Sequence, residues 1–98
     1  MSKPYYTDYV RHALRFYTRN PNPIFNTEVD KNNWYACHNA FKGYKDKDRE
    51  ILVSVYSGYD TLPDEVYNAS EHFHINQNLI WDMMKDFERK VAKRRGLL

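Results

Sequence analysis

The stretch Thr61-Leu62-Pro63-Asp64-Glu65 contains the clearest start signal for a helix in this chain. A threonine side chain can accept a hydrogen bond from an unpaired amide at a helix start, and proline is tolerated in the first turn. Acidic residues are favoured next because the helix dipole is positive at this end. The sequence therefore predicts a helix that begins here and turns Val66, Ala69 and Phe73 towards a core.

A tight turn and a longer helix follow. Ile75-Asn76 interrupts the helical spacing, and asparagine is a residue type that caps helices. From Gln77 to Arg95 the apolar residues recur every three or four positions, the period of an α-helix. The expected buried side carries Ile80, Met84, Phe87 and Val91. The opposite, exposed side carries Asn78, Asp82, Lys85 and Arg89.

The same period predicts three helices upstream. The first runs from about Tyr5 to Arg19 and ends before a proline-containing loop. The second follows the capping sequence Thr27-Glu28-Val29-Asp30 and stops near Gly43. The third opens with Asp46 as its cap and ends at Gly58. The expected inward residues are Tyr6, Tyr9, Val10, Ala13, Leu14, Tyr17, Trp34, Cys37, Ala40, Phe41, Ile51, Leu52, Val55 and Tyr56. On the first helix Arg11, Arg15 and Arg19 line the other side.

No segment alternates like a β-strand, so the predicted fold is all-α. We expect one five-helix domain over residues 1–98, with N-terminal helices in residues 1–45 and a helix-turn-helix-like part in residues 46–98. The composition is globular, with 42% hydrophobic and 16% aromatic residues. Trp81 lies beside the apolar side of its helix, which favours packing, for example against the first helix, with a dimer interface as the alternative.

The charge is nearly balanced, at +2 from 15 Lys and Arg against 13 Asp and Glu. It is unevenly distributed, because residues 89–95 hold five basic residues and no acid. The single cysteine, Cys37, cannot form a disulfide within the chain. We expect a cytoplasmic protein without a membrane segment, since neither a signal-peptide-like stretch nor an apolar run of membrane-spanning length is present.

Residues that carry out catalysis or bind metal do not occur in recognisable patterns. Cys37-His38 and His72-x-His74 have spacings that point side chains apart on one helix, which disfavours a shared metal ion. The three glycines are scattered and form no phosphate-binding loop. The sequence therefore predicts a non-enzymatic protein without cofactor or metal.

Residues 48–98 resemble the helix-turn-helix of sigma-70 region 4, and most of all the small sigma-like regulators of phages and mobile elements of Gram-positive bacteria. Asp48-Arg49-Glu50-Ile51-Leu52 is similar to the helix before the motif, and Thr61 to Val66 to the start of the supporting helix. Ile75 to Ile80 is similar to the turn and the start of the recognition helix, and Phe87 to Leu97 to the closing segment. The segment 66–75 is a few residues longer than in that family, and His74 stands where the family has glycine.

The resemblance implies a DNA-binding transcription regulator whose partner is double-stranded DNA. RNA polymerase and a second copy of the chain are further candidate partners. The expected DNA-binding residues are Asn76, Gln77, Asn78, Lys85 and Arg89. Carboxamides suit adenine edges and cations suit phosphates. Against this, Asp82, Asp86 and Glu88 oppose phosphate, so a helical protein–protein interaction module or phage assembly component is the alternative.

Overall fold

The computed structural model describes residues 3–98, which form five α-helices. They are α1 (Thr7–Arg19), α2 (Glu28–Phe41), α3 (Asp46–Ser57), α4 (Leu62–Phe73) and α5 (Gln77–Arg94). None of the residues from 3 to 98 lies in a β-strand. The all-α, five-helix prediction is therefore confirmed.

Three helix starts are capped by the side chains that the sequence indicated. Thr27 accepts a hydrogen bond from the amide of Asp30 at 3.1 Å, and Thr61 accepts one from Asp64 at 3.4 Å. Asn76 accepts one from the amide of Asn78 at 2.7 Å. Each bond satisfies an amide that has no partner within its helix.

Two predicted helix starts were wrong by one or two residues. The helix α1 begins at Thr7, because the Thr7 amide closes a turn onto the Pro4 carbonyl at 3.1 Å and leaves Tyr5 outside the helix. Asp46 is the first residue of α3 and not its cap. Its carboxylate lies 3.7 Å from a guanidinium nitrogen of Arg49, one turn further along.

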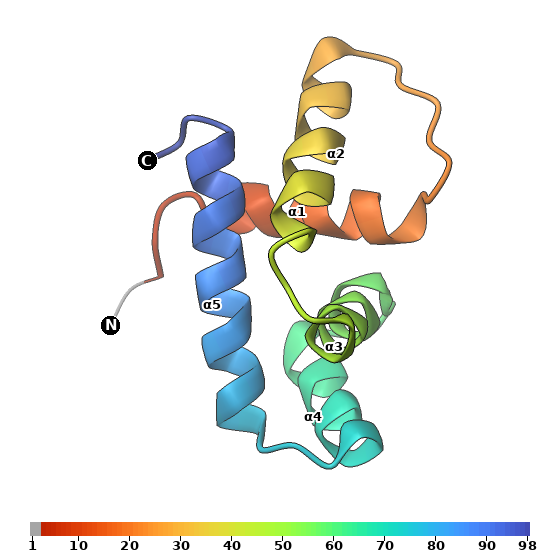
Figure 1. Cartoon of the computed structure of the whole chain (residues 1–98), viewed down its shortest axis with the longest axis vertical. Coiled ribbons are helices and arrows are strands. Elements are labelled where there is room, and N and C mark those ends of the chain that lie inside the picture. The colour runs from red at the N-terminus through yellow and green to blue at the C-terminus, as the bar shows by residue number, and fades with distance from the viewer. Residues whose placement is uncertain (1–2) are drawn as a thin grey trace.

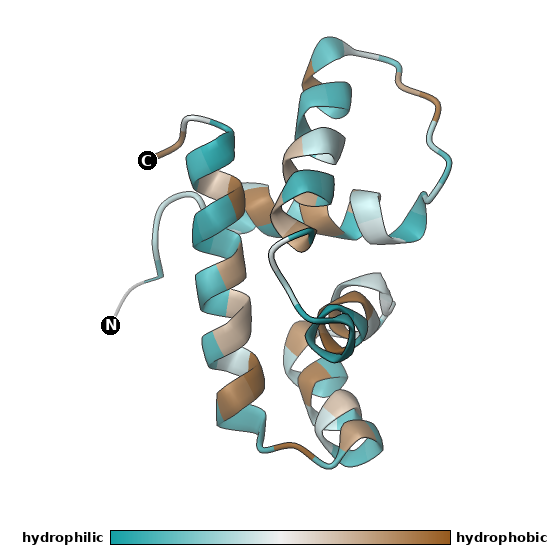
Figure 2. Ribbon diagram, viewed as in Figure 1, coloured by the Kyte–Doolittle hydropathy of each residue, from teal (hydrophilic) through white to brown (hydrophobic). Residues whose placement is uncertain are grey.

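The helices enclose one hydrophobic core (Figure 1). α1 crosses the molecule and packs against α2, α3 and α5, while α4 packs against α3 and α5. α5 also contacts α2, and it lies along one side of the molecule, where its outer side meets no other helix (Figure 1). Apolar residues face the interior between the helices, and the outer side of α5 is mostly hydrophilic (Figure 2).

The core agrees with most of the expected inward residues. Fully buried members come from all five helices, including Leu14, Cys37, Tyr56, Val66 and Phe87. Tyr9 was wrongly placed inside, because it lies at the edge of the α1–α2 contact and is 42% exposed. Its hydroxyl instead meets the Asn33 side chain at 3.2 Å. Three further expected core residues, Tyr17, Trp34 and Phe73, are only partly buried at the margin.

The arginines of α1 reach back into the fold. Arg15 donates to the Gly58 carbonyl at 2.7 Å and Arg19 to the Ser57 carbonyl at 3.3 Å. These bonds satisfy carbonyls at the C-terminal end of α3, where the helix leaves them without partners. Arg11 pairs with Glu88 of α5 at 2.9 Å. All three arginines therefore hold helices together.

Candidate nucleic-acid interface

The connection between α4 and α5 consists of three residues, His74 to Asn76. His74 takes the left-handed backbone conformation, with φ 55°. The Ile75 amide donates a hydrogen bond to the Ser70 carbonyl at 3.2 Å, and the Ser70 hydroxyl donates one to the Ile75 carbonyl at 2.7 Å. The conformation at His74 is one that glycine adopts most easily, so the turn keeps the geometry of a glycine turn without the glycine.

The buried side of α5 fixes how this helix is rotated. Its core residues Ile80, Met84, Phe87 and Val91 all have no exposed surface. Residues on the opposite side must therefore point to solvent. We call Asn78, Asp82, Lys85 and Arg89 the outer stripe; all four are exposed.

The five predicted DNA-binding residues are all exposed, but they do not form one surface. At about 100° per residue, Asn78, Lys85 and Arg89 lie within about 40° of one another around the helix axis. Gln77 points about 100° away from Asn78 and shares only the first turn with it. Asn76 uses its side-chain oxygen to cap the helix. The structure therefore groups Asn78, Lys85 and Arg89, and places Gln77 and Asn76 beside them at the helix start.

Two of the three acids on α5 are paired with neighbouring donors. Glu88 is only 4% exposed and accepts bonds from Arg11 and from the hydroxyl of Tyr56, at 2.9 Å and 2.6 Å. Asp86 accepts a bond from the Tyr44 hydroxyl at 2.7 Å and pairs with Lys90 at 3.1 Å. These two donors lower the pKa of Asp86 below its ordinary value, with the Tyr44 bond as the larger cause.

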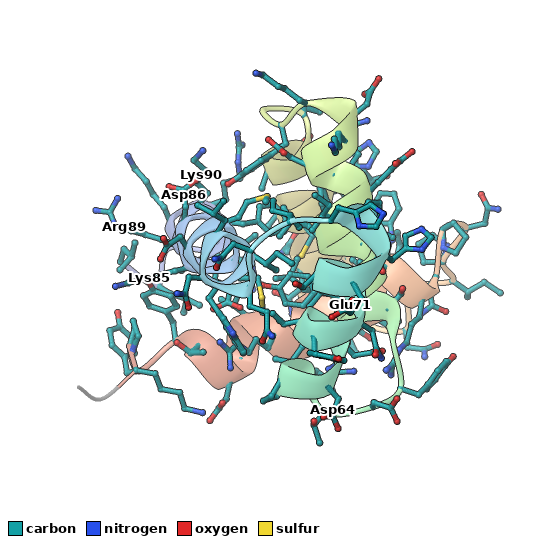
Figure 3. The ribbon with its side chains drawn as sticks, turned by 90° about the horizontal axis from the view of Figure 1, so that it is seen from below. Asp64, Glu71, Lys85, Asp86, Arg89 and Lys90 are labelled. Atoms are coloured by element: carbon teal, nitrogen blue, oxygen red, sulfur yellow. The ribbon has the colours of Figure 1, made fainter. Side chains whose placement is uncertain are left out.

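The outer side of α5 consequently carries two cations that these two acids do not pair, Lys85 and Arg89. Lys85 and Arg89 form no ion pair with any residue between 3 and 98. Figure 3 shows both projecting from α5, with Asp86 beside Lys90, while Asp64 and Glu71 of α4 lie on the other side. Asp82 is the remaining acid of the outer stripe, and it too forms no ion pair within the described range.

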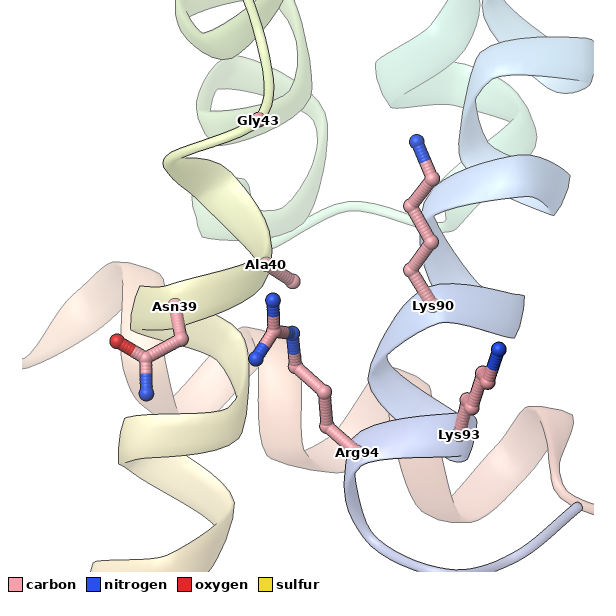
Figure 4. A pocket seen from close by; sticks show the side chains of 6 residues that line it. All are labelled: Asn39, Ala40, Gly43, Lys90, Lys93 and Arg94. Atoms are coloured by element: carbon pink, nitrogen blue, oxygen red, sulfur yellow. The ribbon is translucent and has the colours of Figure 1, made fainter.

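Further cations lie on the side of α5 that faces α2. A pocket of about 500 Å³ lies between the C-terminal turn of α2 and α5, and no acidic residue lines it. Its lining residues are Asn39, Ala40, Gly43, Lys90, Lys93 and Arg94 (Figure 4). Sequence reasoning did not include Lys90, Lys93 or Arg94 in the site, although the run of basic residues after position 88 was a signal for them. No local signal pointed to Tyr44, which reaches Asp86 from 42 residues away.

Trp81 and Cys37 are both explained by packing. Trp81 is half-buried, and the guanidinium carbon of Arg11 lies 5.9 Å from the centre of its ring, which places it towards α1. Cys37 has no exposed surface, and burial raises the pKa of its thiol to about 12. The thiol is therefore protonated at neutral pH and is not available as a nucleophile.

In residues 3–98 no cluster of three or more His, Cys, Asp or Glu side chains could hold a metal ion. No helix in that range is both long and apolar enough to cross a membrane. Comparisons of the chain with protein-family models, with curated proteins and with solved structures found no match.

Proposed function

We propose that this protein is a DNA-binding transcription regulator of the sigma region 4-like kind, with α4 as the supporting helix and α5 as the recognition helix. The observation that carries the proposal is the outer stripe of α5, which is exposed along its length and follows a capped, three-residue turn. A helix is about 10–12 Å across with its side chains, which fits the major groove of B-DNA at about 12 Å.

Asn78 and Asp82 are the proposed base readers. They lie one turn apart on the outer stripe near the start of α5, the part of a recognition helix that contacts base edges. A carboxamide can form two hydrogen bonds with adenine, and a carboxylate can accept one from the amino group of cytosine. This assignment gives Asp82 a role in binding, although its charge would repel phosphate.

Lys85 and Arg89 are the proposed phosphate contacts. Arg89 lies about 16 Å along the axis from Asn78, beyond the reach of the same base step. Cations at this distance suit the sugar–phosphate backbone, where contacts orient the protein without reading sequence. Lys93, about 40° from Arg89 around the helix axis, extends the same basic surface towards the C-terminal end of α5.

The proposal is tested by selecting duplexes from a random pool and measuring their affinity by fluorescence anisotropy at two salt concentrations. We expect affinity that falls as salt rises, because phosphate binding releases counterions. A selected duplex should also bind more tightly than a scrambled one of equal length. If no duplex binds with an affinity that depends on salt, the proposal is refuted.

A second candidate function, binding another protein, is favoured by an apolar surface on the loop before α2 and on α2 itself. Ile24 of the loop is 87% exposed and Tyr35 of α2 is 45% exposed. Phe25 and Trp34 lie beside them, with ring centres 6.0 Å apart. Clustered exposed apolar residues commonly mark protein contacts. This surface is distinct from the outer stripe, so it is compatible with a regulator that also contacts RNA polymerase or a second copy in the cytoplasm.

A further inference from the structure

The carboxylate of Asp86 is the group best placed to interfere with Arg89. The two residues are three positions apart on α5, a spacing at which acidic and basic side chains meet on a helix surface. An Asp86–Arg89 ion pair would occupy the guanidinium that we propose for phosphate binding. The structure does not contain this pair: within residues 3–98, Arg89 takes part in no ion pair or side-chain hydrogen bond.

The Asp86 carboxylate is instead bonded to Tyr44 and Lys90. Its Oδ2 accepts a bond from the Tyr44 hydroxyl at 2.7 Å and lies 3.1 Å from the Lys90 ammonium. Figure 3 shows Asp86 lying beside Lys90, whereas Arg89 extends outwards. Two donors on one carboxylate, one of them charged, hold it more firmly than either would alone.

Tyr44 is itself held in place. Its ring meets the ring of Phe87 edge to face with centres 5.2 Å apart. The ammonium of Lys90 lies 4.7 Å from the centre of the same ring. Two groups bond Asp86, the Tyr44 hydroxyl and the Lys90 ammonium. The ring of Tyr44, in the loop between α2 and α3, therefore positions both of them.

We propose that Tyr44 is a positioning residue for the DNA-binding side of α5, which keeps the Asp86 carboxylate away from Arg89 and so leaves the guanidinium free for a backbone phosphate. This inference rests on the proposed function. It assigns to the loop between α2 and α3 a part in DNA binding without contact between Tyr44 and DNA.

The first arm of the test measures binding to a duplex of arbitrary sequence, because phosphate contacts are independent of sequence. Tyr44→Phe keeps the ring and removes only the hydroxyl. We expect it to weaken binding several-fold and to reduce the salt slope of log K by about 0.9, the contribution of one phosphate. Asp86→Asn in the same chain should restore both, because no carboxylate remains to pair with Arg89. Tyr59→Phe, on the exposed loop between α3 and α4, is the matched control and should bind as the unchanged protein does.

The second arm needs no DNA. Proton exchange of the Arg89 Nε–H group with water, followed by ¹H–¹⁵N NMR, reports whether the guanidinium is paired. Tyr44→Phe should slow this exchange, and adding Asp86→Asn should return it to its original rate. A merely structural role for Tyr44 would lower the melting temperature without this reversal.

The two arms separate the possible failures. If the unchanged protein does not bind duplexes in a salt-dependent way, the proposed function fails, and with it the role of Tyr44 in DNA binding. If it binds but Tyr44→Phe changes neither the salt slope nor the Arg89 exchange, the positioning role is overturned while the proposed function stands. If Asp86→Asn does not restore binding to Tyr44→Phe, the effect does not pass through Asp86 and the inference is also overturned.

Discussion

The guanidinium Nε of Arg11 in α1 lies 2.9 Å from Oε2 of Glu88 in α5, and the Glu88 side chain is only 5% exposed. The same oxygen accepts a bond from the Tyr56 hydroxyl of α3 at 2.6 Å. One carboxylate therefore connects three helices that are far apart in the sequence. Because Glu88 lies on the recognition helix of the proposed regulator, these bonds also help to set the rotation of α5.

Replacing Glu88 with Gln should lower the free energy of unfolding by about 2–3 kcal/mol. The substitution removes the charge that compensates Arg11, and leaving one member of a buried pair alone is costly; partial exposure of Arg11 reduces this cost. Urea denaturation measures the change. Asp82→Asn, an exposed acid on the same helix, is the control and should alter stability by no more than about 0.5 kcal/mol. Equal effects of the two substitutions would contradict a stabilising role for the buried pair.

Cys37 should make the fold less stable at alkaline pH. Its pKa is raised from 9.0 to about 12 in the folded state, so the folded protein favours the protonated thiol. This contribution is complete below pH 9.0 and is lost as the pH rises towards about 12, because only the unfolded chain releases the proton. The loss approaches about 1.4 kcal/mol per pH unit in this range.

Cys37→Ala isolates that contribution. At neutral pH it should cost on the order of 1 kcal/mol, because a small cavity replaces the sulfur. Between neutral pH and about pH 11 the free energy of unfolding of this variant should fall less steeply than that of the unchanged protein. The reason is that the variant lacks the thiol that ionises in the unfolded chain. The free energy of unfolding is measured by urea denaturation at both pH values. An equal fall in the two proteins would show that the thiol is not protected by burial.

His74→Gly should stabilise the protein by on the order of 1 kcal/mol. A residue with a Cβ is strained at φ 55°, and glycine is not. Thermal denaturation provides the measurement. His72→Gly, only two residues earlier but inside α4, is the matched control and should destabilise by about 0.5–1 kcal/mol, because glycine disfavours the helical backbone. The prediction fails if both substitutions shift the melting temperature in the same direction.

Asn78→Ala and Arg89→Ala should affect DNA binding differently. Loss of a base contact at Asn78 should cost about 1–3 kcal/mol on the selected duplex and relax preference at one base position. Loss of Arg89 should weaken binding to all duplexes and reduce the salt slope by about 1. Anisotropy at two salt concentrations separates the two outcomes, and neither substitution should change the melting temperature much, because both residues are exposed. A loss that is identical on selected and scrambled duplexes would exclude Asn78 as a base reader.

Asp82→Ala should have opposite effects on general affinity and on selectivity. Removing its charge should strengthen binding to scrambled duplexes, because a carboxylate near phosphate is repelled. Binding to the selected duplex should gain less, or weaken, because the proposed contact to a cytosine amino group is lost. Competition between the two duplexes measures this ratio. An equal gain on both would mean that Asp82 contributes repulsion alone.

The sequence by itself determined the helices and most of their ends. Threonine and asparagine caps act on amides two or three residues away, so Thr27, Thr61 and Asn76 could be recognised from local order. The apolar period also located the buried side of α5, since any helix of that sequence must turn the same residues inwards. The exposure of Asn78, Lys85 and Arg89 followed from this period.

Only the tertiary structure decided which charges remain available. Asp86 and Glu88 read as acids that oppose DNA, but their partners Tyr44 and Arg11 lie 42 and 77 residues away. The sequence placed the arginines of α1 on the side away from its apolar stripe, yet two of them bond the end of α3. A charge is neutralised by whatever lies within a few ångströms of it, and that neighbourhood forms only when distant segments pack together.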